Sequence, residues 1–192
     1  MGHQVEPADS TDPLRPGSAA GTQNVELTEL LGGPMVVSTV GMAVADLRSA
    51  MEKYWETLGW GPWRIYRQEP PSLQEMRYRG AAAEFSFLVA GTSAPGGTAF
   101  WLCQPLEGPS LYRDLVDEGL PGPHFMTVWR STREESDTAR RWFQDHGATE
   151  LMSARVDRSI EFAFLDTRDL CGMILETGYG RSDSQILEAT FP

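Results

Sequence analysis

Few side chains in this sequence have both the chemistry and the setting for catalysis, and the first of them is Glu176, which ends an apolar segment. A glutamate at the end of a strand is most often solvated, and that interpretation stays open. If the fold packs the carboxyl group among aromatic side chains, loss of water raises its pKa and lets it exchange a proton near neutral pH. In such a setting Glu176 is a candidate for general acid–base catalysis.

Histidine, a common acid–base residue, occurs three times. His3 lies in the N-terminal segment, and His146 stands before a glycine at the predicted end of a helix, where a surface histidine commonly acts as a cap. His124 is the only one inside a strand-like motif, directly before Phe125. Because side chains alternate along a strand, His124 points away from the face that carries Phe125. His124 is a second catalytic candidate, with a structural role as the alternative.

The overall charge limits the choice of partners. The 192 residues include 16 basic and 27 acidic side chains, which gives a formal net charge of −11. Proteins that bind nucleic acid or anionic membranes carry the opposite charge or a concentrated basic patch, so neither partner is expected. No apolar run approaches the roughly 18–20 residues that cross a bilayer, and the polar N-terminus is unlike a secretory signal. Cys103 and Cys171 lack CxxC spacing and are expected to be buried reduced thiols of a cytoplasmic protein, with a disulfide or a catalytic thiol as the alternatives.

The chain divides into a leader, one domain and a short extension. Residues 1–33 are rich in proline, glycine and charged residues and lack an apolar face, which predicts a disordered leader. Residues 34–180 form the domain, and residues 181–192 form a C-terminal extension. Within the domain we expect module one at 36–107, a linking helix at 108–121 and module two at 122–180.

Both modules follow one order: a strand, an amphipathic helix and three further strands. In module one, Asp46 caps a helix that ends at Gly59. In module two, Thr132 and Glu135 form a capping box and Gly147 ends the helix. No glycine-rich phosphate loop and no GxSxG motif is present, so nucleotide-binding and nucleophile-elbow folds have no support. The order predicts an α+β fold in which two βαβββ modules pair around a cleft.

Four separated motifs carry a resemblance to a known family. They are Val40-Gly41-Met42-Ala43-Val44 with Leu58-Gly59-Trp60-Gly61-Pro62-Trp63, Leu102-Cys103-Gln104-Pro105, Gly122-Pro123-His124-Phe125, and Phe162-x-Phe164-x-Asp166-Thr167 with Gly172-Met173-Ile174-Leu175-Glu176. In this order they resemble the vicinal oxygen chelate superfamily, most closely its glyoxalase and methylmalonyl-CoA epimerase-like branch, over residues 36–178. The resemblance implies a glyoxalase-like fold, whose cleft in this family holds a divalent cation.

The family's four metal-ligand positions can be compared one at a time. By resemblance they fall at Thr39, Trp101, Phe125 and Glu176, and only the last carries the usual ligand. A divalent cation needs several nitrogen or oxygen ligands, which tryptophan and phenylalanine do not offer. The resemblance therefore implies a cleft without a metal or other cofactor. A divalent metal held through Glu176 is the alternative.

Alternation along each strand shows which of its side chains share a face, and the resemblance implies that these faces line the cleft. The expected lining has Glu176 at its floor, Thr39, Trp101, Phe125, Thr127 and Trp129 on the cleft face, and Trp60, Trp63 and Tyr78 at the rim. The simpler interpretation is that the aromatic residues form core. As a set, they favour burial and stacking of a flat or apolar ligand.

Two functions from different classes remain. The first is a metal-independent, glyoxalase-type enzyme, an isomerase, epimerase, lyase or cyclase that moves a proton on a carbonyl-containing substrate through Glu176. The alternative is a non-catalytic protein that binds or sequesters a small molecule, like the resistance proteins of the same superfamily. In both cases the expected partner is a small molecule with an apolar or aromatic part, and the resemblance also implies a homodimer.

Overall fold

A curved sheet of eleven strands organises the chain in the computed structural model, which describes residues 21–93, 97–157, 159–180 and 187–192. The elements are α1 (Gly21–Leu30), β1 (Thr39–Ala43), α2 (Leu47–Leu58), β2 (Trp63–Gln68), β3 (Leu73–Tyr78), β4 (Ala81–Ala82), β5 (Phe87–Ser93), β6 (Ala99–Pro105), α3 (Leu111–Glu118), β7 (Phe125–Arg130), α4 (Arg133–Asp145), β8 (Thr149–Val156), β9 (Ile160–Thr167), α5 (Arg168–Cys171), β10 (Met173–Tyr179) and β11 (Leu187–Phe191). Within these described ranges no helix is long and apolar enough to cross a bilayer.

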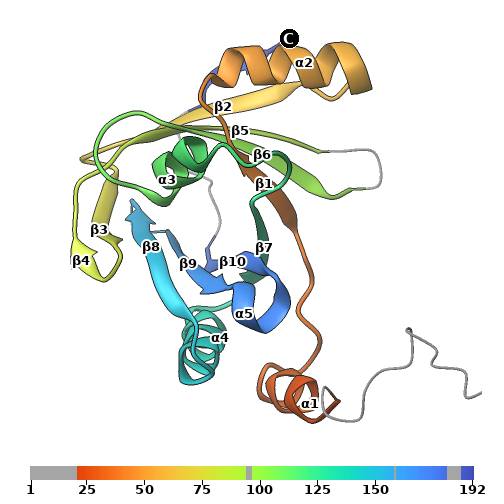
Figure 1. Ribbon diagram of the computed structural model, residues 1–192, viewed down its shortest axis with the longest axis vertical. Helices are drawn as coiled ribbons and strands as arrows, with labels where there is room; N and C mark the ends of the chain where they lie inside the picture. Colours follow the sequence, from red (N-terminus) through yellow and green to blue (C-terminus); the bar gives the residue numbers. More distant parts are fainter. Residues whose placement is uncertain (1–20, 94–96, 158, 181–186) are drawn as a thin grey trace, which may run out of the picture.

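The two halves of the sheet have the same internal order. Across the sheet the strands run β11-β2-β5-β6-β1-β7-β10-β9-β8-β3-β4. β1 pairs in parallel with β6 in the first half, and β7 pairs in parallel with β10 in the second. β1 and β7 are antiparallel neighbours and join the halves. The prediction of an α+β fold with two βαβββ modules is confirmed, and the sheet bends so that the halves face each other (Figure 1).

An additional strand covers the outer edge of each half. Between β2 and β5 the chain crosses to the second half, where β3 pairs with β8 and forms a hairpin with β4. β11, which belongs to the extension predicted at 181–192, pairs with β2. Both additions satisfy backbone groups that an open edge would leave unpaired. Module one therefore contains a hairpin that belongs by pairing to module two, which the sequence pattern did not reveal.

Part of the predicted leader is ordered. Residues 1–20 lie outside the described part of the chain, but α1 follows them directly. Leu27 and Leu31 are buried in a cluster with Ala139 and Phe143 of α4. Burial of these apolar side chains holds the helix against the domain. The prediction of disorder is therefore wrong for residues 21–31.

Two helices, α2 and α4, cover the outer face of the sheet, one over each half (Figure 1). The predicted N-caps are present, whereas the Glu135 carboxylate accepts from the backbone N–H of Ser131 instead of Thr132, and His146 caps the end of α4. Asp46 accepts a hydrogen bond from the backbone N–H of Ser49 at 2.9 Å, and Gly59 ends α2 with a φ of 67°. Thr132 accepts one from the backbone N–H of Glu135 at 3.2 Å. These local signals fix where both helices start and therefore how they lie across the sheet.

The concave face holds α3, which falls within the predicted linking helix at 108–121 (Figure 1). Leu111 and Tyr112 of α3 are buried in a cluster that also contains Phe87 and Phe162, one from each half. The rings of Phe87 and Phe162 are 6.4 Å apart between centroids, so the two halves approach each other on this side. Tyr112 belongs to this cluster and also lines the cavity described next.

Candidate functional site

A cavity of about 380 Å³ lies on the concave face, between the two halves of the sheet. Its polar lining consists of Ser38, Thr39, Tyr66, Gln68, Tyr112, Thr127 and Glu176, and the remaining lining consists of Phe87, Val89, Gly91, Ala99, Trp101, Trp129, Val156, Ile160, Phe162 and Gly180. The volume is at the lower end of the range for small-molecule sites, and mostly apolar walls with a few polar groups are typical of them. The cavity therefore suits a small, largely apolar molecule.

Three polar side chains stand in a row across the middle of the sheet. Thr39 of β1 pairs in register with Thr127 of β7, which pairs in turn with Glu176 of β10. In-register neighbours point to the same face of a sheet. All three line the cavity, on the face that the family resemblance implied for them.

Glu176 is only 3% exposed. The Thr127 hydroxyl donates a hydrogen bond to its Oε2 at 2.5 Å. Burial raises the pKa of the Glu176 carboxyl group to about 7, against the opposing effect of the Thr127 hydrogen bond. Near neutral pH the acid and the carboxylate are therefore both populated, which is the condition for efficient general acid–base catalysis.

Two weaker acids near Glu176 keep their protons. Burial raises the pKa of the Cys103 thiol far above its usual range, and the charge of Glu176 adds to this effect. Burial also raises the pKa of Tyr112, with Cys103 and Glu176 as further causes. Tyr112 therefore remains a phenol that can donate a hydrogen bond into the cavity, and Cys103 is an unreactive buried thiol. Cys171, by contrast, is exposed, which corrects the expectation that both thiols are buried.

Two indoles, Trp101 and Trp129, border the cavity from the strands on either side of β1. Each ring lies over a glycine of its outer neighbour. A Cβ atom at Gly91 would lie 3.0 Å from Trp101 Nε1, and one at Gly178 would lie 2.6 Å from Trp129 Cζ3. Because Gly91 belongs to β5 and Gly178 to β10, the rings lean away from β1 in opposite directions. The two glycines thus let both rings lie back from the part of the cavity beside Thr39 of β1.

Phe125 is on the concave face but belongs to the core. It is 1% exposed, and its ring centroid is 5.0 Å from that of Phe164 and 6.2 Å from that of Tyr112. Its ring occupies the space beside Gly41, where a Cβ atom would collide with it. The prediction that Phe125 lines the ligand site is corrected, since its neighbours enclose the ring.

Trp60 and Trp63 pack on the outer face of the sheet, not at the rim of the cavity. Trp63 has 0% exposure in the cluster beneath α2, and its indole N–H donates to the Trp60 carbonyl oxygen at 2.8 Å. The Trp60 ring stacks on Tyr54 of α2, with 5.6 Å between centroids. Alternation along β2 puts Trp63 opposite to Tyr66 and Gln68, which do reach the cavity. These two tryptophans therefore hold α2 on the sheet.

Tyr78 also lies away from the cavity, on the crossing strand β3. Its hydroxyl donates to Asp114 Oδ2 at 2.6 Å, and Arg79 Nη2 approaches the same oxygen at 3.0 Å. Since Asp114 is on α3, these contacts hold the β3–β4 hairpin against that helix. The predicted rim position is corrected because β3 leaves the first half of the sheet before Tyr78.

His124 has a structural place. Its Nδ1 accepts a hydrogen bond from the Ala43 backbone N–H at 3.0 Å, and its Nε2 lies 2.9 Å from the Leu120 carbonyl oxygen. Nδ1 is therefore unprotonated, and Nε2 carries the proton that it donates to Leu120. His124 does not line the cavity that contains Glu176. Both ring nitrogens hold backbone groups, so the catalytic prediction for His124 is corrected.

The cavity does not offer the ligands of a divalent metal. Of the four positions implied by the family, Trp101 and Phe125 carry no metal donor, and Thr39 carries one neutral hydroxyl. In the described ranges, no three histidine, cysteine, aspartate or glutamate side chains gather closely enough to hold a metal ion. A single carboxylate and a hydroxyl at these positions do not fit the family's cation.

Two lining residues, Gln68 and Tyr112, were not predicted. Gln68 follows Tyr66 by two positions in β2, opposite to Trp63, and this period of two was the available signal. Tyr112 lies in α3, whose apolar side was apparent from sequence but whose position on the concave face was not. Because α3 was predicted only as a linking helix, Tyr112 was not expected near Glu176.

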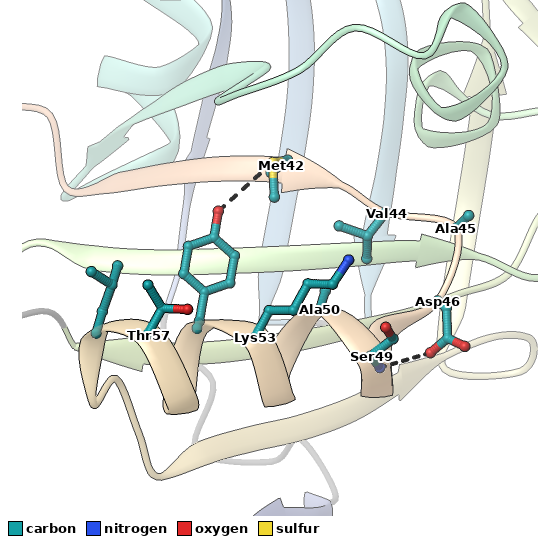
Figure 2. A pocket seen from close by; sticks show the side chains of 10 residues that line it. Met42, Val44, Ala45, Asp46, Ser49, Ala50, Lys53 and Thr57 are labelled. Carbon is teal, nitrogen blue, oxygen red and sulfur yellow. Dashed lines mark hydrogen bonds between the residues drawn. The ribbon is translucent and has the colours of Figure 1, made fainter.

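A second pocket, of about 550 Å³, runs along α2 on the outer side of the sheet. Figure 2 shows Lys53 extending from α2 toward Val44, just after β1. The acidic side chain here, Asp46, already caps the helix through Ser49 (Figure 2). The pocket is larger, but its lining, within the described residues, contains no buried acid such as Glu176. We therefore take the concave cavity as the candidate site.

Solved structures with this fold share little sequence with the chain. The hypothetical protein BH1468 from Bacillus halodurans C-125 is similar over 79% of this chain and 98% of its own, with 16% identity and a TM-score of 0.52. Methylmalonyl-CoA epimerase from Mycobacterium tuberculosis is similar over 76% of this chain and 87% of its own, with 21% identity and a TM-score of 0.49. No protein-family model and no curated protein matches the chain. The chain therefore shares its overall fold with the BH1468 protein.

Proposed function

We propose that this chain is a metal-independent enzyme that moves a proton on a small carbonyl compound bound in the concave cavity. The setting of Glu176 carries the proposal. Its carboxyl group is buried, receives a hydrogen bond from Thr127 and has a pKa raised to about 7 by burial. A buried acid that lines a cavity and titrates near neutral pH is a feature of catalytic sites more than of structural ones.

In this mechanism the Glu176 carboxylate removes a proton from the carbon next to the substrate carbonyl. The electron pair of the broken C–H bond moves onto the carbonyl oxygen and forms an enolate. The Glu176 carboxylic acid then returns the proton to the same carbon or to a conjugated one, so the product is an isomer of the substrate. Thr127 holds the carboxylate in position throughout.

The enolate oxygen requires hydrogen-bond donors in place of a cation. Three groups that line the cavity can donate: the phenol of Tyr112, the hydroxyl of Thr39 and the indole N–H of Trp101. Within the described part of the chain, neither the Thr39 hydroxyl nor the Trp101 indole has a hydrogen-bond acceptor of its own. Each of them is therefore free to bind an oxygen of the substrate.

Exchange of carbon-bound hydrogen tests the proposal without knowledge of the natural substrate. The probe is 2-tetralone, a flat bicyclic ketone whose C1 hydrogens lie between the aromatic ring and the carbonyl. With the full chain in D2O, loss of the C1 proton signal in the NMR spectrum reports proton abstraction. We expect exchange above the buffer rate, and at least a hundredfold loss of that excess in Glu176→Gln, in line with the usual contribution of a general base of about 10²–10⁴.

The control is Glu56→Gln, which changes an exposed glutamate of α2 far from the cavity. It is expected to exchange the probe at the wild-type rate. Equal exchange by wild type and Glu176→Gln would remove Glu176 from the mechanism. Exchange at the buffer rate by the wild-type protein, with the probe bound, would favour the second function.

That second function is non-catalytic binding of a small molecule. It is favoured by the two indole walls, because Trp101 and Trp129 offer large apolar surfaces for a flat ligand. A binding protein has no need for an acid that titrates near pH 7, however, and burying that acid lowers stability. The position of Glu176 therefore favours the enzyme.

A further inference from the structure

The cavity has a marked charge preference. Its seventeen lining residues in the described part of the chain include Glu176 but no lysine, arginine or histidine. A carboxylate or phosphate on a ligand is normally paired with arginine, lysine or a metal, because an unpaired buried charge is strongly disfavoured. An anionic ligand here would find no such partner and would meet the carboxylate of Glu176. The lining therefore disfavours anions.

Gln68 is a polar group that lines the cavity without a partner. It is 3% exposed, and the structure gives its side-chain amide no hydrogen bond within the described residues. A primary amide has two N–H donors and a carbonyl acceptor, and leaving such a group unpaired in a buried place is unfavourable. A ligand that both donates and accepts hydrogen bonds would satisfy both ends of the Gln68 amide.

The walls restrict the shape of the ligand. Trp101 and Trp129 lie back over Gly91 and Gly178, which leaves space between them beside Thr39 of β1. A flat ring system can lie in that space and contact indole on either side. A bulky branched molecule would have to displace an indole that is already in contact with the neighbouring strand.

We infer that the ligand of this cavity is an uncharged, flat molecule with an amide-like or lactam-like edge, and that Gln68 is the residue that recognises this edge. The inference deepens the proposed function, since it names the substrate class of the same cavity, and it rests on that function for the assignment of this cavity as the site. Gln68 comes from β2 and Glu176 from β10, five strands apart in the sheet. Recognition and proton transfer are thus assigned to separate walls of the cavity.

Three probes of equal ring size test both parts of the inference by calorimetric titration of the full chain at pH 8. They are 2-naphthamide, 2-naphthoate and 2-methylnaphthalene, which carry an amide, a carboxylate and a methyl group on the same ring. We expect 2-naphthamide to bind the wild type most tightly, and 2-naphthoate to bind at least about tenfold more weakly than the amide. This order follows from the unpaired amide of Gln68 and the lack of a cation in the lining.

The variant Gln68→Leu replaces the amide side chain with an apolar side chain of similar size. It is expected to weaken binding of 2-naphthamide about 2- to 10-fold, to the affinity of 2-methylnaphthalene, while the affinity for 2-methylnaphthalene is unchanged or higher. Gln68→Met, which is unbranched, serves if the leucine variant does not fold by circular dichroism. The matched control is Gln74→Leu, on the exposed face of β3, with wild-type affinities for all three probes.

Binding of 2-naphthoate as tight as that of 2-naphthamide would overturn the assignment of an uncharged ligand. Wild-type affinity of both Gln68 variants for 2-naphthamide would overturn the role of Gln68, and so would failure of the wild type to bind any probe. The deuterium exchange experiment is a separate readout. Loss of exchange with the binding order intact contradicts the proposed reaction alone, whereas exchange of 2-tetralone with an altered binding order contradicts the ligand class alone.

Discussion

Replacement of Glu176 by glutamine is expected to stabilise the protein in alkaline solution and to have little effect in acid. Glutamine has nearly the same shape as glutamate, and its side-chain carbonyl can still accept the hydrogen bond from Thr127, which lies 2.5 Å from Glu176 Oε2. It carries no charge, so it avoids the desolvation that raises the pKa of Glu176. The gain in stability must therefore depend on pH in a way that follows from this pKa.

The sign and size follow from proton linkage. The pKa of Glu176 is raised from 4.5 to about 7 in the folded protein. Between these values the folded protein keeps a proton that the unfolded chain has lost, so the free energy of unfolding falls as pH rises and is fully reduced above about pH 7. At about 1.4 kcal/mol per pH unit, the buried carboxylate destabilises the fold by roughly 3 kcal/mol at pH 8 and by less than about 1 kcal/mol at pH 5.

Urea unfolding of the wild type and Glu176→Gln at pH 5 and pH 8 measures this difference. The variant is expected to be more stable by roughly 3 kcal/mol at pH 8, and the advantage should shrink by about 2 kcal/mol or more at pH 5. The contributions of all other titrating groups cancel in the difference between the two free energies of unfolding. The exposed substitution Glu56→Gln should show no such pH dependence. A stability difference that is equal at the two pH values would mean that Glu176 is not a buried acid with a raised pKa.

Three further substitutions test the geometry around the site. Gly91→Ala should push the Trp101 ring toward the cavity and weaken binding of 2-naphthamide about tenfold or more, with the fold intact by circular dichroism, because Trp101 is the side chain that the new methyl group meets. Gly41→Ala should lower the free energy of unfolding by about 1–3 kcal/mol, measured in urea, because the methyl group collides with Phe125. His124→Ala should lower it by about 1–3 kcal/mol through loss of two backbone partners, and should leave the deuterium exchange rate per folded molecule unchanged.

Each of these expectations has a contrary result. Tighter probe binding by Gly91→Ala would mean that its indole neighbour does not border the occupied space. Wild-type stability of Gly41→Ala would mean that the ring of Phe125 is free to move out of the core. Loss of exchange in a stable His124→Ala protein would return this histidine to the mechanism.

The sequence and its resemblance to the family were sufficient for the paired modules and for three central residues of the site. Helix caps such as Asp46 and Thr132 depend on neighbours within four residues, so their positions could be recognised directly. The resemblance implied that Thr39 and Glu176 lie in the cleft, and alternation put Thr127 on the face of Phe125; their alignment in one row comes from the pairing of β1, β7 and β10. Their role in binding stays a prediction, as do a cytoplasmic location and a homodimer.

The aromatic residues could not be sorted by sequence because core and cavity positions have the same composition. Phe125 and Trp129 lie on the same face of β7. Phe125 is enclosed by Phe164 and Tyr112, whereas Trp129 borders the cavity. The difference depends on which residues come from other strands and from α3. Trp63 was misplaced for another reason: the side of β2 on which it falls is set by the packing of α2, not by the strand alone.

The positions of Tyr78 and Gln68 depend on contacts between segments that are far apart in the sequence. Tyr78 was predicted at the rim of the cleft, yet its strand, β3, pairs with β8 of the other module. Crossing of this kind leaves no periodic signal, since the strand pattern is the same whichever partner is present. Gln68 could be recognised as a lining residue only from the folded structure, because strands distant in sequence form the cavity around it. Its unpaired amide is a property of the folded protein alone.

The pH dependence of deuterium exchange into 2-tetralone tests most directly whether a buried Glu176 is the base. Since the carboxylate form abstracts the proton, the protein-catalysed kcat/KM should rise with pH and level off above a midpoint near 7, the value to which burial raises the pKa of Glu176. Exchange with a midpoint near 4.5, the ordinary value for this carboxyl group, would contradict a buried base. Exchange that follows hydroxide concentration alone would contradict catalysis by Glu176 altogether.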